Sequence, residues 1–243
     1  MKTLRGILRL IFFALAALWL ICRVLWFTLW KGENLHRSLR IRQQWTRRFL
    51  PAIGVRIHSE GKAPDFPCIV MCNHRSYLDP AVLVYDFPGM PVSKAEVANW
   101  PVIGYGAKIS GTLFLRRESQ HSRKLLLNDI ALKVKEGFAV ILFPEGTTHD
   151  KPYTTALKRG GFDLAARTDI PIVPVALEYK STADYWIGSD TFLPHFIRRF
   201  GEKNMFVAVR YGEPIRSDDP EFLLRETQNW MDAQVSGMRR EFF

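Results

Sequence analysis

The chain has 243 residues, enough to bury a substantial core, so we expect one domain with an appendage. The net charge of +10 favours an anionic partner, and composition alone leaves nucleic acid and an anionic membrane surface equally open. The three cysteines, Cys22, Cys68 and Cys72, make no even disulfide set and have no second Cys/His cluster nearby. We therefore expect a reducing compartment and no metal site.

An apolar run at the N-terminus decides between these partners. Residues 10–30 read LIFFALAALWLICRVLWFTLW, with Arg23 as the single charge. As a helix the run would be about 31 Å long, which suffices to cross a bilayer. Arg23 lies toward one end, so an alternative is a helix that lies in one leaflet. Its length, and the absence of a small-x-small site after it, argue against a cleaved signal peptide.

The following segment predicts a basic amphipathic helix that ends before Pro51. An ordinary solvated helix has the same pattern, but directly behind an apolar anchor we expect it to lie on anionic headgroups. Its arginines outnumber Lys2, Arg5 and Arg9 ahead of the anchor, so the positive-inside rule predicts that everything after the anchor is cytoplasmic. We divide the chain at residue 50, into an anchor region (1–50) and a main domain (51–243). The helix carries apolar Leu35, Leu39, Ile41, Trp45 and Phe49, and basic Arg37, Arg40, Arg42, Arg47 and Arg48.

Residues 68–80, CIVMCNHRSYLDP, carry the first chemical signal. A buried strand ends there in Asn73 and His74, and Asp79 precedes Pro80, as an N-cap precedes proline at the first helical position. A tight turn would bring the Asp79 carboxylate to one ring nitrogen of His74 and leave the other nitrogen free to act as a base. The spacing alone arises by chance in most chains, but the end of an apolar strand is where α/β sheets place ligands.

Further strands and helices follow in alternation. We predict strands at 55–58, 91–94, within 111–117, and at 139–143, 170–179 and 205–211, and helices at 121–136, 158–168 and 220–240. Lys94 ends one strand and could reach the pocket of His74, although a solvated lysine is the more frequent outcome. Residues 181–199 read as an irregular, aromatic insertion that faces the membrane.

A second motif, FPEGTT, closes the strand at 139–143. Pro144 restrains φ and Gly146 permits backbone conformations closed to other residues, so Glu145 would project from a rigid turn. A plain turn explains the pattern equally well when it is taken alone.

These motifs together resemble the glycerolipid acyltransferases of the 1-acyl-sn-glycerol-3-phosphate acyltransferase (lysophosphatidic acid acyltransferase) type. Asn73, His74, Ser76 and Asp79 reproduce the NHxSxxD block, and the resemblance extends over roughly residues 50–215. It implies an α/β fold with a mixed or mostly parallel sheet covered by helices. It also implies His74 as general base, Asp79 as the group that orients it, and transfer of an acyl group from a thioester to a lipid hydroxyl, here phosphatidic acid synthesis.

The resemblance assigns further residues. Arg117 matches the arginine of Gly-x-x-Phe-x-x-Arg and is expected to hold the acceptor headgroup. Lys94 stands at the position of a family lysine that precedes an apolar helix, so the resemblance also implies a helix at 97–106. Glu145, with Gly146 and Thr147 beside it, is expected to contact the glycerol or headgroup of the acceptor. Pro174 belongs to the fourth motif, Ile-Pro-x-x-Pro-Val, which forms part of the wall. The donor would be acyl-CoA or acyl carrier protein, with no cofactor and no nucleic acid, at a bacterial inner membrane.

One departure concerns the acceptor. Most members continue FPEG with Thr-Arg, whereas this chain has Thr147 and Thr148. The change resembles the branch that acylates lyso-aminolipids such as lyso-ornithine or lyso-glycine lipids, which is the alternative function.

Two rival mechanisms or functions are weaker. Ser76 or Cys72 could act as a nucleophile beside the base, but no GxSxG turn accompanies them. A membrane lipid-binding protein without chemistry would have no need of His74 and Asp79.

Overall fold

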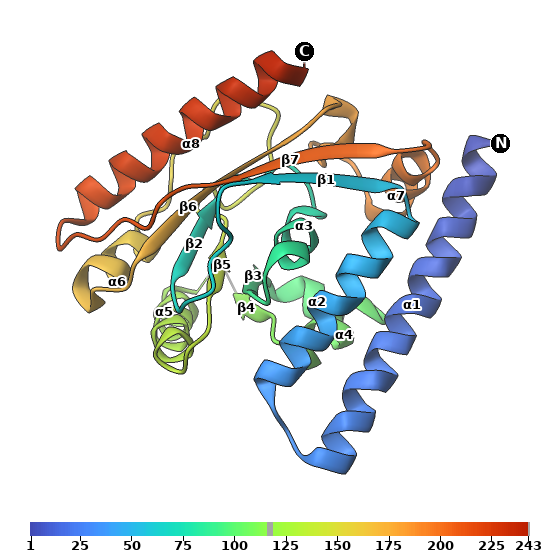
Figure 1. The fold of residues 1–243 in the computed structure, drawn as a ribbon, viewed down its shortest axis with the longest axis horizontal. Coiled ribbons are helices and arrows are strands. Elements are labelled where there is room, and N and C mark those ends of the chain that lie inside the picture. The colour runs from blue at the N-terminus through green and yellow to red at the C-terminus, as the bar shows by residue number, and fades with distance from the viewer. Residues whose placement is uncertain (116–118, 243) are drawn as a thin grey trace.

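The computed structural model describes residues 1–115 and 119–242 and contains one seven-stranded sheet (Figure 1). The strand order is β1-β7-β6-β2-β5-β3-β4. All neighbouring strands are parallel except β6 and β7, so β1 and β7 run opposite to the other five. The predicted α/β class with a mostly parallel sheet is confirmed. The strands are β1 (Val55–Glu60), β2 (Ile69–Cys72), β3 (Met90–Lys94), β4 (Leu113–Leu115), β5 (Val140–Leu142), β6 (Ile172–Tyr179) and β7 (Met205–Tyr211).

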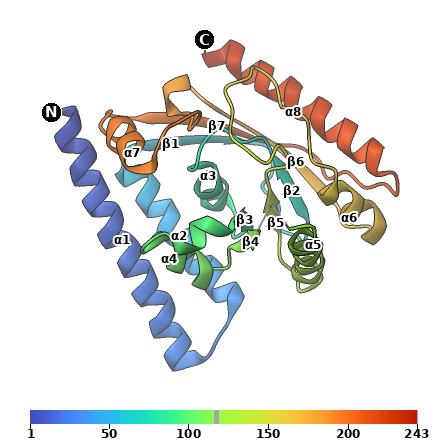
Figure 2. The same ribbon diagram turned by 180° about the vertical axis from the view of Figure 1, so that it is seen from behind.

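Helices cover both faces of the sheet (Figures 1 and 2). Alternate residues of β2 point to opposite faces, since Val70 and Cys72 pack with α2 and α3 whereas Ile69 and Met71 pack with α5 and α6. The helices are α1 (Lys2–Lys31), α2 (Leu35–Ala52), α3 (Asp79–Asp86), α4 (Ile103–Ile109), α5 (Gln120–Lys135), α6 (Gly160–Thr168), α7 (Phe192–Phe200) and α8 (Pro220–Phe242), with short 3-10 helices at Ala95–Asn99 and Thr182–Asp184.

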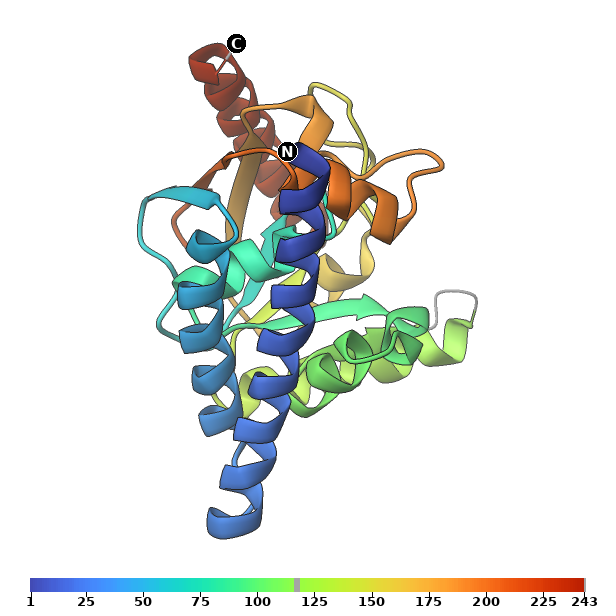
Figure 3. The same ribbon diagram turned by 90° about the vertical axis from the view of Figure 1, so that its right-hand side faces the viewer.

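The long helix α1 packs lengthwise against the rest of the protein (Figure 3). One side contacts α2, α4 and α7, and Ala17, Leu20 and Val24 are buried there. The Trp45 indole N–H donates to the Ala16 carbonyl at 2.8 Å, and Arg9 donates to the Phe200 carbonyl at 3.0 Å. The opposite side exposes large apolar side chains from Leu4 to Trp30. Among the described helices α1 alone is long and apolar enough to cross a membrane, by length and composition.

The amphipathic helix α2 differs from its prediction. Leu39, Ile41 and Phe49 are buried in the protein and not turned toward a lipid surface, because α1 and the sheet cover this side of the helix. The helix also continues through Pro51 to Ala52. Arg40, Arg47 and Arg48 remain exposed, so the basic side of the helix faces outward.

Two further segments were predicted wrongly. Residues 192–200 form α7 and not an irregular insertion, because Pro194 lies in the first turn, where its missing N–H costs nothing, and Phe196 and Phe200 are buried. The helix predicted at 97–106 is divided into a 3-10 helix and α4. Pro101 is the cause, since it holds Trp100 in an extended conformation, with φ −71° and ψ 129°.

Candidate active site

The turn between β2 and α3 holds a histidine and a carboxylate in contact. His74 Nδ1 lies 2.7 Å from Asp79 Oδ2, as the spacing predicted. The helix begins at Asp79 itself, with Leu78 in the N-cap position, so the predicted cap is displaced by one residue. The Asp79 side chain caps the turn instead: Oδ2 also accepts the backbone N–H groups of Arg75 at 2.6 Å and Ser76 at 2.9 Å.

A tyrosine from a different strand completes the coordination of this carboxylate. The Tyr179 hydroxyl, at the end of β6, donates to Asp79 Oδ1 at 2.6 Å. Burial, followed by the nearby Asp79 charge, raises the pKa of Tyr179 well above its ordinary value, so the phenol stays protonated and remains a donor. Asp79 thus accepts from four groups while being fully buried.

The contacts of His74 determine its tautomer. Because the Asp79 carboxylate is an acceptor, Nδ1 carries the proton and Nε2 presents its lone pair. The imidazole stacks on the Phe143 ring, with centroids 4.2 Å apart, and its side chain is 17% exposed at the cavity described below. His74 is therefore restrained in the orientation that a general base needs.

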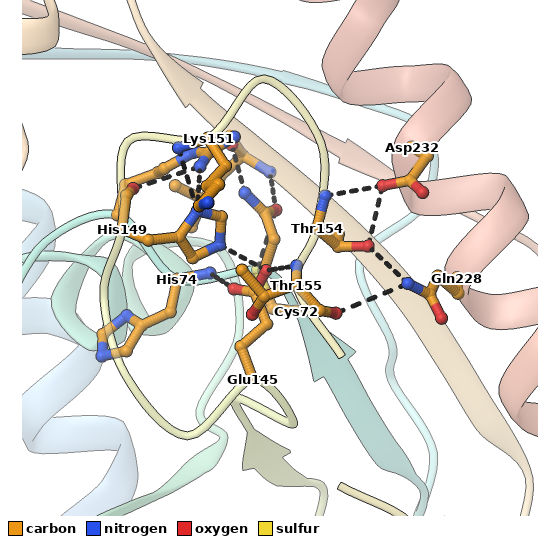
Figure 4. Close-up of polar contacts among 12 residues, drawn as sticks. Cys72, His74, Glu145, His149, Lys151, Thr154, Thr155, Gln228 and Asp232 are labelled. Atoms are coloured by element: carbon orange, nitrogen blue, oxygen red, sulfur yellow. Dashed lines mark hydrogen bonds and ion pairs between the residues drawn. The ribbon is translucent and has the colours of Figure 1, made fainter. Parts of the chain in front are cut away.

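The Glu145 carboxylate forms a hydrogen bond with the backbone of His74 (Figure 4). Its Oε2 accepts the His74 backbone N–H at 2.7 Å, and its Oε1 accepts from His149 Nε2 at 2.6 Å and the Thr155 N–H at 2.9 Å. The side chain is fully buried, and the His74 ring points away from it. That Glu145 contacts the acceptor stays a prediction, and in this structure its carboxylate oxygens already accept from three protein donors.

The tautomer of His149 follows from its other neighbours. His149 Nδ1 lies 3.1 Å from Arg75 Nη1 and 3.1 Å from the Lys151 backbone N–H, and both are donors. Nδ1 must accept, so Nε2 bears the proton that is donated to Glu145. A second hydrogen bond restrains the loop that follows Glu145, since Asp232 on α8 accepts the Thr154 N–H at 2.7 Å (Figure 4).

A buried ion pair lies beneath the turn. The Arg75 guanidinium has no exposed surface and donates to Glu178 Oε2 at 3.3 Å and to the His149 carbonyl at 3.2 Å. Glu178 also accepts from the Tyr185 hydroxyl, and burial raises the pKa of that phenol. These groups connect β2, β6 and the Glu145 loop, so they brace the turn that carries His74.

A cavity of about 800 Å³ opens at His74. One part is apolar, with walls from α1 and α2 such as Ala17, Leu20, Phe49 and Leu50. The charged side chains among its described lining residues are all cationic, with no aspartate or glutamate: Arg42, Lys94, Arg123, Lys158 and Arg159. Such a lining suits an apolar chain joined to an anionic group.

The cavity separates the predicted site residues into two groups. His74, Lys94, Gly146 and Thr147 line it, and the Lys94 and Thr147 side chains are exposed there. Gly146 has φ 75°, the left-handed conformation for which glycine was expected, and a Cβ there would meet the Lys158 side chain.

Asn73, Ser76 and Pro174 are not among the described residues that line the cavity. Asn73 is buried and joins β2 to β6, since its amide exchanges hydrogen bonds with the Leu177 backbone at 2.8 and 2.9 Å. Ser76 is buried in the turn, and the Pro174 carbonyl accepts the Gly212 N–H at 2.9 Å. Arg117 lies outside the described residues.

Cys72 is unsuited to act as a nucleophile. It is fully buried at the end of β2, and burial, followed by the charges of Asp79 and Glu145, raises the pKa of its thiol well above the ordinary value. A protonated thiol without access to the cavity cannot attack a thioester. In the described part of the chain, no three His, Cys, Asp or Glu side chains gather as metal ligands would.

The sequence reasoning missed Tyr179, Arg75 and His149. Arg75 occupies an unspecified position of the NHxSxxD block, and Tyr179 stands at the end of a strand that was read only as a wall. The order of the strands was the missing information, since it places β6 directly beside β2.

Comparison with known proteins identifies the family of the chain. Residues 54–178 match the family described as Acyltransferase. The chain is 31% identical to the lyso-ornithine lipid O-acyltransferase of Pseudomonas aeruginosa, over 82% of this chain and 79% of that protein. It is 35% identical to the chloroplastic 1-acyl-sn-glycerol-3-phosphate acyltransferase BAT2 of Brassica napus, over 46% of this chain and 33% of that protein.

The fold has a solved counterpart. The crystal structure of the 1-acyl-sn-glycerophosphate (LPA) acyltransferase PlsC from Thermotoga maritima superposes with a TM-score of 0.73 at 19% identity and covers 98% of both chains. With a family match over half of its length and a relative alignable along four fifths of it, this chain belongs to the acyltransferase family.

Proposed function

We propose that this acyltransferase moves a fatty acyl group from an acyl thioester to the hydroxyl of a lysolipid with an anionic group in its head, and that His74 is the general base. The observation that carries the proposal is the His74–Asp79 pair at the mouth of an apolar cavity whose described charged lining is entirely cationic.

The reaction needs one base and no covalent intermediate. His74 Nε2 takes the proton from the acceptor hydroxyl as its oxygen attacks the thioester carbonyl, and Asp79 stabilises the imidazolium that forms. When the tetrahedral intermediate collapses, the carbon–sulfur bond breaks and the imidazolium returns the proton to the leaving thiolate. A thiolate is a good leaving group, so no second acid is required.

The mouth of the cavity suits the acceptor headgroup. Lys94 and Arg123 are exposed there and have no hydrogen-bond or ion-pair partner within the described residues. Arg159, in contrast, is paired with Asp163 and Glu221. A phosphate or a carboxylate on the acceptor would supply the missing charge.

We place a lyso-ornithine or related aminolipid first as acceptor and lysophosphatidic acid second, which reverses the order that the sequence motifs favoured. Three relatives whose sequences align along 72–82% of this chain are named lyso-ornithine lipid O-acyltransferases. In addition, the Thr148 hydroxyl donates to the Trp186 carbonyl, so the position where most relatives have an arginine bears no cation for a phosphate.

We place the protein on the cytoplasmic side of a bacterial inner membrane, where acyl-CoA or acyl carrier protein is available as donor. Since α1 packs lengthwise on the domain and its Phe13, Ala17 and Leu20 line the cavity, we propose that its exposed apolar side lies in one leaflet. Lysolipids would then reach His74 from the membrane.

The test uses the purified full chain in lipid nanodiscs with labelled myristoyl-CoA or myristoyl carrier protein, and with lyso-ornithine lipid or lysophosphatidic acid as acceptor. We expect faster transfer to lyso-ornithine lipid, loss of transfer in His74→Ala, and full activity in His58→Ala, whose exposed histidine lies on β1. Faster transfer to lysophosphatidic acid would reverse the order of acceptors. Undiminished transfer by His74→Ala would overturn the mechanism.

A further inference from the structure

Arg42 on α2 is a buried cation in the cavity with unused hydrogen-bond donors. Its side chain lines the cavity and the residue is 7% exposed. Nη2 donates to the Gly89 carbonyl. Nε and Nη1 are buried and have no partner among the described residues, although a guanidinium rarely stays unpaired away from water.

No counter-charge compensates this guanidinium in the described lining. The other charged lining residues, such as Lys94 and Arg123, are cations as well. Burial lowers the pKa of Arg42 to about 9, which still leaves it charged at neutral pH. An isolated buried cation lowers the stability of the folded protein, because its desolvation is not compensated. An anion that enters the cavity and pairs with it offsets much of this penalty.

Arg42 lies at the end of the cavity remote from His74. Ile53, the C-cap of α2 and eleven residues after Arg42, precedes β1. β1 begins at the end of the sheet at which β2 stops before His74. Eleven helical residues span roughly 16 Å. The contact between Arg42 and Gly89 places Arg42 at the same end of the cavity. Gly89 precedes Met90, and Met90 lies beside Val140 and Ile69 at the ends of the strands opposite to His74.

The wall between these two ends is mostly hydrocarbon, with the Thr46 hydroxyl of α2 as a polar group close to Arg42. Helix α2 contributes apolar side chains to the cavity after Arg42, namely Trp45, Phe49 and Leu50. Helix α1 contributes Ala17 and Leu20. The cavity therefore presents a base at one end, an unpaired cation at the other, and a mostly apolar lining between them.

We propose that Arg42 makes this remote end a carboxylate site, so that an unesterified fatty acid occupies the cavity with its carboxylate on Arg42 and its chain directed toward His74. Competition between the fatty acid and the acyl thioester rests on the proposed function, whereas binding itself does not.

The chemistry favours a carboxylate over other groups. The methyl end of an acyl chain accepts no hydrogen bond and would leave both nitrogens unpaired. A carboxylate brings one negative charge and two acceptor oxygens, which match one guanidinium. A phosphate monoester carries more than one charge near neutral pH and would leave an excess negative charge in an apolar space.

The experiment measures displacement of the fluorescent fatty acid cis-parinaric acid from the full chain in nanodiscs, by myristate and by the uncharged myristyl alcohol. The readout is the ratio of the two displacing concentrations, compared between variants. We expect Arg42→Met to lower the preference for the acid by about tenfold or more, since one charged hydrogen bond has at least about that strength. Arg40→Met, on the exposed side of the same helix, should keep it.

An unchanged ratio in Arg42→Met would overturn the proposal and leave Arg42 as a brace between α2 and Gly89. Thermal melting checks that the variant is folded, and Arg42→Gln serves if the methionine variant is not. The same measurement on His74→Ala separates the two proposals, since we expect it to bind myristate normally while acyl transfer is lost.

Discussion

Replacing Asp79 by asparagine tests the catalytic pair without disrupting the turn. The asparagine oxygen can take the place of Oδ2 and keep the donors from His74, Arg75 and Ser76. Its amide then faces the Tyr179 oxygen, which can rotate its hydroxyl and accept. Folding should therefore survive, at a cost of about 1–3 kcal/mol for the lost charge-assisted hydrogen bonds.

Catalysis should suffer much more than folding. With His74 Nδ1 and Asp79 Oδ2 2.7 Å apart, the centres of the two charges lie about 4 Å apart, and their attraction at an effective dielectric constant of 20 is about 4 kcal/mol. The imidazolium that forms during proton abstraction loses this stabilisation, so kcat should fall about 10³-fold.

The assay follows thiol release from acyl-CoA with a thiol reagent, and product formation with labelled donor. His74→Ala sets the floor of activity. Tyr179→Phe removes one neutral donor from Asp79 and should lower kcat by less than about tenfold. A kcat for Asp79→Asn within tenfold of the unmodified enzyme would refute the role of this charge.

Three further changes test the surrounding groups. Glu145→Gln must turn an amide N–H toward either the His74 N–H or the His149 and Thr155 donors. We therefore expect kcat to fall while the KM for the acceptor stays within about threefold. A large rise in this KM alone would indicate that Glu145 binds the acceptor. Glu178→Ala leaves the Arg75 guanidinium buried without its carboxylate and should lower the free energy of unfolding by about 3–5 kcal/mol, measured by denaturation in detergent; a loss below about 1 kcal/mol would contradict the pairing. Burial raises the pKa of the Cys68 thiol from 9.0 to about 12, so its contribution to stability is present below pH 9 and is lost as the pH rises toward 12, at about 1.4 kcal/mol per pH unit. Cys68→Ala should therefore lose less stability than the unmodified chain between pH 8 and pH 10.5 in thermal melts, and equal losses would count against the shift.

Local patterns in the sequence predicted most elements and the contact between His74 and Asp79. An apolar run that ends in polar residues and a proline specifies a strand, a turn and a helix start within one short segment, so the approach of His74 and Asp79 followed from their spacing together with their place at the end of a strand. The wrong predictions at α7 and at 97–106 both depend on the position of one proline. Pro194 lies in the first turn of a helix, where it is tolerated, whereas Pro101 interrupts the helix that was predicted.

The tertiary structure decided how the site is held and what encloses it. Tyr179 reaches Asp79 across 100 positions of sequence only because β6 pairs with β2. Glu145 accepts the backbone N–H of His74 because the loop after β5 folds back beside the turn that follows β2. The N-terminal helix, read from sequence as a separate anchor, forms a wall of the same cavity. These relations depend on strand order and on packing between distant segments. Hydrophobic periodicity specifies only which local element a segment forms and which side of it is buried, so it predicts neither.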